Sequence, residues 1–123
     1  MTPRRRIPSA DGRRALARWA AEREAIPQAD LATAVRFALE ELADSAPGGA
    51  VEVRVPPFGA VQCCGGPRHT RGTPPNTVEI APQPWLALAT GELPWDDAVR
   101  SGQVRASGAR ADLAEHLPLR GRL

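Results

Sequence analysis

Lysine is absent from the 123 residues, so every one of the 16 Lys+Arg positions is an arginine. Together with the many alanines this is typical of a GC-rich genome, and we infer no arginine-specific chemistry from it. The formal net charge is only +2, and the excess lies in Arg4, Arg5 and Arg6. A nucleic-acid-binding protein should instead carry a basic stripe across a folded face. We therefore expect no nucleic-acid partner.

Long apolar runs are also missing. No stretch approaches the roughly 20 apolar residues of a membrane helix, so we expect no stable membrane insertion. The charged start of the chain has no apolar segment behind it, which argues against a secretory signal. The two cysteines are adjacent and do not form a disulfide framework. We therefore expect a cytoplasmic protein with reduced thiols.

The Cys-x-x-Cys spacing of structural zinc sites does not occur. Adjacent strand residues point to opposite faces, so Cys63 and Cys64 are not expected to bind one ion together. We expect no metal, no cofactor and no catalytic residue, with Cys63 in the core and Cys64 partly exposed. A thiol enzyme is an alternative, because Arg68, His69 or Arg71 could activate either thiol.

Two helices are predicted near the start of the chain. Residues 1–8 are expected to form a flexible basic arm, and residues 9–123 a single domain. Ser9 is a candidate cap for a helix that ends near Ala25, and Asp30 for a second helix. In the second helix apolar residues recur every three or four positions. These residues are Leu31, Val35, Ala38, Leu39 and Leu42.

Strand patterns follow. Strict alternation at Val51–Val55 predicts a strand, and Ala60–Cys64 is its returning partner in a hairpin. Further short strands are predicted at Arg68–Arg71, Thr77–Ile80 and Gln103–Ala106. Helical segments are expected at Pro84–Thr90 and Pro94–Ser101, with a closing helical turn at Ala111–Leu117. Strands that precede helices, rather than alternating with them, indicate an α+β fold.

The amino-acid sequence from Val51 onward is similar to that of a known protein family. The stretches that carry this similarity are "VEVRVPPFGAVQC", "GPRHTRGTPPNTVE", Trp85, "LATGEL" and "SGQVRASGARADL". The segment from Val51 to Leu119 resembles the sterol carrier protein-2 domain, especially the small actinobacterial sterol carrier family proteins. The resemblance implies an α+β fold with about five strands in a mostly antiparallel sheet and helices packed on one face. It also implies an apolar tunnel between these layers for sterols, fatty acids or acyl thioesters.

Candidate ligand-binding residues are of two kinds. The apolar ones would line the tunnel, although each is also a candidate for the ordinary core. They are Leu39, Leu42, Phe58, Trp85, Leu86, Leu88, Val99, Val104 and Leu117. The polar ones are Gln62, Arg68, His69 and Arg71, which would meet a carboxylate or phosphate head group.

The segment "CCGGPRHTRGTPPN" at positions 63–76 permits two interpretations. Its glycines and arginines could form an anion-binding turn, in which alternation places His69 and Arg71 on one face. It could equally be an exposed edge strand whose arginines lie in water and whose prolines block further pairing.

The sequence favours a small binding protein of the sterol-carrier type that carries or senses an apolar or amphipathic ligand without catalysis. One alternative is a protein-interaction domain with a filled core, which would contact a protein partner through residues 68–76. The thiol enzyme at Cys63 or Cys64 is the second alternative.

Overall fold

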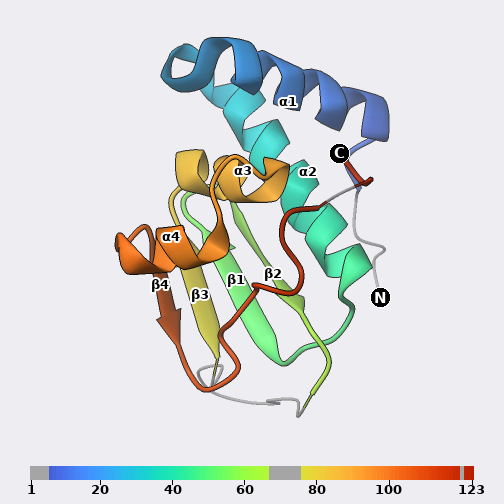
Figure 1. Ribbon diagram of the computed structural model, residues 1–123. Coiled ribbons are helices and arrows are strands. Elements are labelled where there is room, and N and C mark those ends of the chain that lie inside the picture. Colours follow the sequence, from blue (N-terminus) through green and yellow to red (C-terminus); the bar gives the residue numbers. More distant parts are fainter. Residues whose placement is uncertain (1–5, 67–75, 120) are drawn as a thin grey trace.

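A computed structural model describes residues 6–66, 76–119 and 121–123 (Figure 1). Its helices are α1 (Ser9–Glu22), α2 (Gln28–Ser45), α3 (Pro82–Thr90) and α4 (Trp95–Arg100), with a 3-10 turn, η1, at Arg23–Ala25. Its strands are β1 (Val51–Val55), β2 (Gly59–Cys63), β3 (Thr77–Ile80) and β4 (Val104–Ser107). Within these described ranges, no helix combines the length and the apolar character needed to cross a bilayer.

The described strands form one sheet in the order β2-β1-β3-β4. The β1–β2 and β3–β4 pairs are antiparallel, whereas β1 and β3 are parallel. The predicted α+β class is confirmed. The sequence predicted about five strands, and the structure describes four. The remaining predicted strand, Arg68–Arg71, lies outside the described residues.

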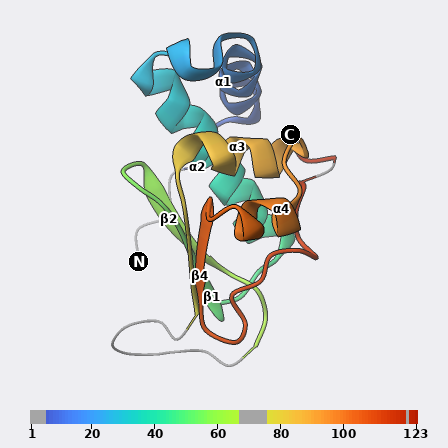
Figure 2. The ribbon, with the colours of Figure 1, turned by 60° about the vertical axis from the view of Figure 1, so that its left-hand side comes forward.

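The sheet has one buried face and one polar face. On β1 the valines are buried, whereas Glu52 and Arg54 between them are partly exposed and form an ion pair with each other. This alternation confirms the predicted hairpin, whose core-facing residues are Val51, Val53, Val55, Val61 and Cys63. Helices α2, α3 and α4 lie on the same side of the sheet, and α1 crosses α2 (Figures 1 and 2). The structure is therefore two-layered, with α1 added outside α2.

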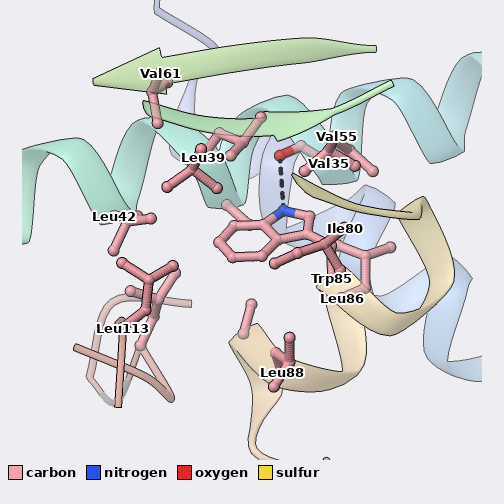
Figure 3. Packing of buried hydrophobic residues seen from close by; sticks show 14 of the residues in the cluster. Val35, Leu39, Leu42, Val55, Val61, Ile80, Trp85, Leu86, Leu88 and Leu113 are labelled. Atoms are coloured by element: carbon pink, nitrogen blue, oxygen red, sulfur yellow. Dashed lines mark hydrogen bonds between the residues drawn. The ribbon is translucent and has the colours of Figure 1, made fainter. Parts of the chain in front are cut away.

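Trp85 lies at the centre of the buried layer (Figure 3). Its side chain is 0% exposed, and its indole N–H donates a hydrogen bond of 3.3 Å to the carbonyl of Val35 in α2. It thereby joins α3 to α2 above the sheet. The other large, fully buried side chains are those of Phe37, Leu39, Leu42, Ile80, Leu86, Leu88 and Leu113.

The predicted helix caps are wrong. Pro8 occupies the cap position of α1, and Ser9 is the first helical residue without a side-chain capping bond. Likewise α2 follows Pro27, so Asp30 lies inside its first turn. Each proline has an extended ψ of 139° or 144° that leads directly into the helix. Asp30 is still well placed, since a carboxylate in the first turn complements the helix dipole.

The C-terminal segment forms a turn where a closing helical turn was predicted. The N–H groups of His116 and Leu117 both bond the carbonyl of Leu113, at 2.9 and 3.1 Å. Pro118 cannot continue such a turn as a helix, because it lacks an N–H group. The next N–H, that of Leu119, donates to the carbonyl of Ala89 at 2.9 Å and fixes the segment against α3.

The expected N-terminal arm is described only from Arg6 onward. The guanidinium of Arg6 pairs with Glu41 and Asp44. The N–H of Ile7 donates to the carboxylate of Glu40 at 2.9 Å. Residues 6 and 7 therefore lie against α2.

Gly12 marks the close approach of α1 to α2. A Cβ at this position would lie 2.2 Å from Cγ of Phe37, far inside normal contact. Alanine usually favours a helix over glycine by about 0.5–1 kcal/mol. Here we expect Gly12→Ala to lower the free energy of unfolding by about 1–3 kcal/mol, because overpacking outweighs propensity.

Urea unfolding measures the effect of Gly12→Ala. The control is Ala17→Gly, the reverse change at an exposed position of the same helix, which should lower stability only by the propensity difference of about 0.5–1 kcal/mol. A Gly12→Ala protein more stable than the wild type would show that α1 does not pack on Phe37 in this way.

Candidate functional site

The predicted tunnel residues lie mostly in the core. Six of them are exposed by only 0 to 6%, namely Leu39, Leu42, Trp85, Leu86, Leu88 and Val104. Phe58 is partly buried in the β1–β2 turn, whereas Val99 on α4 is 44% exposed. Because these six residues belong to one packed cluster, part of which is drawn in Figure 3, a ligand between sheet and helices would have to displace them.

The predicted polar residues are not brought to this core. Gln62 is exposed on β2, opposite Glu52 of β1. Since its neighbours Val61 and Cys63 face the helices, Gln62 lies on the other face of the sheet. Arg68, His69 and Arg71 lie outside the described residues. Their role at a head group therefore stays a prediction.

A groove with mostly apolar lining side chains lies where α3, α4 and the C-terminal segment meet, and we name it the Trp95 groove. Its volume is about 310 Å³, at the lower end of the range of roughly 300–1,000 Å³ for small-molecule sites. Its apolar lining consists of Leu88, Leu93, Pro94, Trp95, Ala114, Leu117 and Pro118. Gly91 and Asp96 complete the described lining. Leu88 and Leu117, both predicted as ligand-binding, thus meet here.

Backbone hydrogen bonds set the shape of the Trp95 groove. Gly91 ends α3 with a left-handed φ of 91°, and its N–H bonds the carbonyls of Ala87 and Leu88. The N–H of Leu93 also reaches the carbonyl of Ala87, at 3.1 Å, and turns the chain towards α4. Leu119 holds the opposite wall through its bond to α3. Glycine at position 91 permits this turn without steric penalty.

Asp96 is the charged residue among the described lining of the Trp95 groove. Glu92, which precedes Leu93 in the chain, is held elsewhere by two hydrogen bonds from the guanidinium of Arg23, at 2.7 and 2.6 Å. These bonds keep the pKa of Glu92 below its usual range, so this carboxylate stays ionised and paired. Arg23 also lies over the ring of Trp19, 4.4 Å from the ring centroid. The lining side chains of the groove are therefore apolar except for one carboxylate, although its exposed surface also includes polar atoms.

Sequence reasoning missed Trp95 as a site residue. The Pro94-Trp95 pair was interpreted only as the start of a short helix. A tryptophan followed by two aspartates on a six-residue helix is a signal that could have found it, since such a helix offers little core for so large a ring. Trp95 is indeed only partly buried, whereas Trp19 and Trp85 are buried.

A larger groove of about 520 Å³ lies between α1 and α2. Its lining is rich in charges, but these largely pair with one another. Arg18 bonds Glu22 and Asp30, and Arg14 bonds Asp11. Arg36 donates to the carbonyl of Phe58 at 2.7 Å. Several of the charges in this groove are therefore already paired, and its apolar lining residues are Ile7, Pro8 and Ala15.

The cysteines differ from their predicted placement in two ways. Cys63 is buried as predicted, but Cys64, expected to be partly exposed, is also buried, at 8%. The two sulfurs were expected on opposite faces, yet they lie 3.4 Å apart. The reason is that Cys64 follows the end of β2 and has a φ of 71°, so strand alternation no longer applies to it. Burial and the neighbouring Cys64 raise the pKa of the Cys63 thiol, which keeps it protonated.

Comparison with known proteins gives one assignment. No curated protein matches the chain significantly. A protein family described as bacterial SCP ortholog matches residues 27–119, which is more than half of the chain. The matched segment contains α2, the sheet, α3, α4 and every described residue of the Trp95 groove, but not α1. The chain therefore belongs to the family of bacterial sterol carrier protein orthologs.

Proposed function

We propose that the protein is a non-catalytic binding protein that holds an apolar or amphipathic small molecule in the Trp95 groove. The observation that carries this proposal is the set of side chains that line the groove, which are apolar except for Asp96. Family membership supports a lipid as the ligand class, such as a fatty acid or an acyl thioester. The position of the whole described lining inside the family-matched segment supports this groove over the one beside α1.

The chemistry of the groove supports binding rather than catalysis. Its described lining has one carboxylate and no thiol, hydroxyl or imidazole to act as a nucleophile or base. A thiol enzyme that uses Cys63 is disfavoured, because burial raises the pKa of this thiol and a protonated thiol is a poor nucleophile. We place the protein in the cytoplasm, where its two unpaired cysteines would stay reduced.

The negative charge of Asp96 affects which head group the ligand can have. Two like charges about 6 Å apart in water repel by roughly 0.7 kcal/mol. An anionic head group inside the groove would therefore weaken binding about threefold. We expect decan-1-ol to bind more tightly than decanoate, unless Arg68, His69 and Arg71 contact the head group.

Isothermal titration calorimetry with decan-1-ol tests the proposal. Leu117→Asp should weaken binding by about ten- to a hundredfold, because burying a leucine contributes about 1.5–3 kcal/mol. The matched control is Val99→Asp, the same kind of change on an exposed residue of α4 that does not line the groove. Equal affinities of Leu117→Asp and the wild type would contradict the proposed site.

A protein-interaction domain is the second candidate function. The observation that favours it is the burial of Leu39, Leu42 and Trp85, which makes the space between the layers a packed core. The same titration separates the two functions. A wild-type protein that binds neither decan-1-ol nor decanoate would favour the interaction domain.

A further inference from the structure

The fold holds the thiols of Cys63 and Cys64 next to each other. Their sulfurs are 3.4 Å apart. The backbone of Cys64 is fixed on both sides, since its N–H donates to Ala46 at 2.7 Å and its carbonyl accepts from Ala50 at 3.1 Å. These bonds join the end of β2 to the segment between α2 and β1. The fold thus holds Cys64 in the left-handed conformation that turns both sulfurs to one side.

The separation of the two sulfurs suits a shared ligand better than a disulfide. A disulfide requires about 2.05 Å between sulfurs, so the pair would have to close by more than 1 Å. Two thiolates on one tetrahedral ion, with bonds of about 2.3 Å, lie roughly 3.8 Å apart. The observed 3.4 Å is much nearer to the second value.

The surroundings restrict which ligand fits. Among the described residues no group of three or more His, Cys, Asp or Glu side chains is placed to hold a metal ion. Within the described ranges, a structural zinc site, which takes four protein ligands, therefore lacks its other donors. The ligand class that fits is therefore a thiophilic element that needs only two sulfur donors from the protein.

We propose that Cys63 and Cys64 are a chelating dithiol that binds a monosubstituted trivalent arsenical, or a metalloid of the same thiophilic class, through both sulfurs. In the reaction two As–O bonds of the hydrated arsenical break and two As–S bonds form. Each thiol proton leaves with one hydroxide as water, so no oxidant or reductant is needed.

Cys64 is the entry to the pair. It lines a pocket of about 250 Å³ together with Arg110 and His116, whereas Cys63 is completely buried behind it. A reagent would therefore meet the sulfur of Cys64 first and then close onto Cys63. This order predicts that a reagent with one reactive group modifies Cys64 and leaves Cys63 unmodified in the folded protein.

Phenylarsine oxide is the probe, measured by intact-protein mass spectrometry in excess glutathione and by thermal melting. The wild type should keep one arsenical adduct. Cys64→Ser and Cys63→Ser should each bind the arsenical at least about a hundredfold more weakly, because they lack the second, intramolecular As–S bond. At about 100 times its dissociation constant the arsenical should raise the wild-type melting temperature by about 5–15 °C. Melting curves of both variants without the reagent show that they fold.

Three results would overturn the proposal. An adduct no more resistant to glutathione in the wild type than in Cys64→Ser would mean that only one sulfur binds. A lower melting temperature with the arsenical would mean that the unfolded chain, not the folded pair, chelates it. A product that has lost two hydrogens without gaining arsenic would mean that the pair closes as a disulfide.

Discussion

Val53→Asp is expected to unfold the protein. Val53 is 0% exposed in the central part of β1, where it pairs with Val61 of β2 and Val78 of β3. A carboxylate at this position would be buried without a partner, and an uncompensated buried charge costs several kcal/mol. Total stabilities of domains of this size are only about 5–15 kcal/mol. We therefore expect the loss of most or all folded protein at 25 °C.

Circular dichroism and urea unfolding measure the effect of Val53→Asp. The matched control is Ala60→Asp, which places the same charge on the neighbouring strand at an exposed position opposite Arg54. This control should melt within a few degrees of the wild type. If Val53→Asp melts where the control does, β1 does not face the core as described.

The substitutions Trp85→Ala and Trp95→Ala are expected to distinguish a residue of the packed core from a residue of the Trp95 groove, because they should lower stability by different amounts. Trp85 is fully buried and bonds the carbonyl of Val35, so its removal should lower the free energy of unfolding by about 3–5 kcal/mol. Trp95 is only partly buried at the edge of the core. Its removal should lower stability by no more than about 1–2 kcal/mol, because less apolar surface is lost.

Ligand binding should show the opposite order for the same pair. Trp95→Ala removes the largest side chain of the groove and should abolish measurable binding of decan-1-ol, while the protein stays folded. Urea unfolding and calorimetry on both variants measure the two effects. A Trp95→Ala protein that binds normally would place the ligand elsewhere, and a stable Trp85→Ala protein would contradict the packed core.

Local patterns were sufficient to predict the four described strands and the buried face of the hairpin, but not the strand order. The alternation of Val51, Val53 and Val55 with two charged residues identifies the core face of β1, and that face is buried. The apolar period of α2 likewise predicted the burial of Leu39 and Leu42. These patterns succeed because one buried face requires a fixed spacing along each element. The family resemblance is confirmed by the match over residues 27–119.

Contacts between distant segments could not be predicted in this way. The Trp95 groove joins residues near 90 to residues near 117, and the bond between Leu119 and Ala89 that holds them together has no sequence signature. The proximity of the two sulfurs accompanies the left-handed φ of Cys64 and its backbone bonds to Ala46 and Ala50, at a position where strand periodicity has ended. The caps failed because proline replaced the expected side-chain cap, as at Pro8.

Acrylamide quenching of tryptophan fluorescence tests the proposed groove most directly. Of the three tryptophans, Trp19 and Trp85 are 2% and 0% exposed, so quenching reports mainly on Trp95. Saturation with decan-1-ol should lower the quenching constant by at least about half, because the ligand covers an apolar ring. Trp95→Phe should remove this change. An unchanged constant while calorimetry shows the alcohol to be bound would contradict the placement of the ligand in the Trp95 groove.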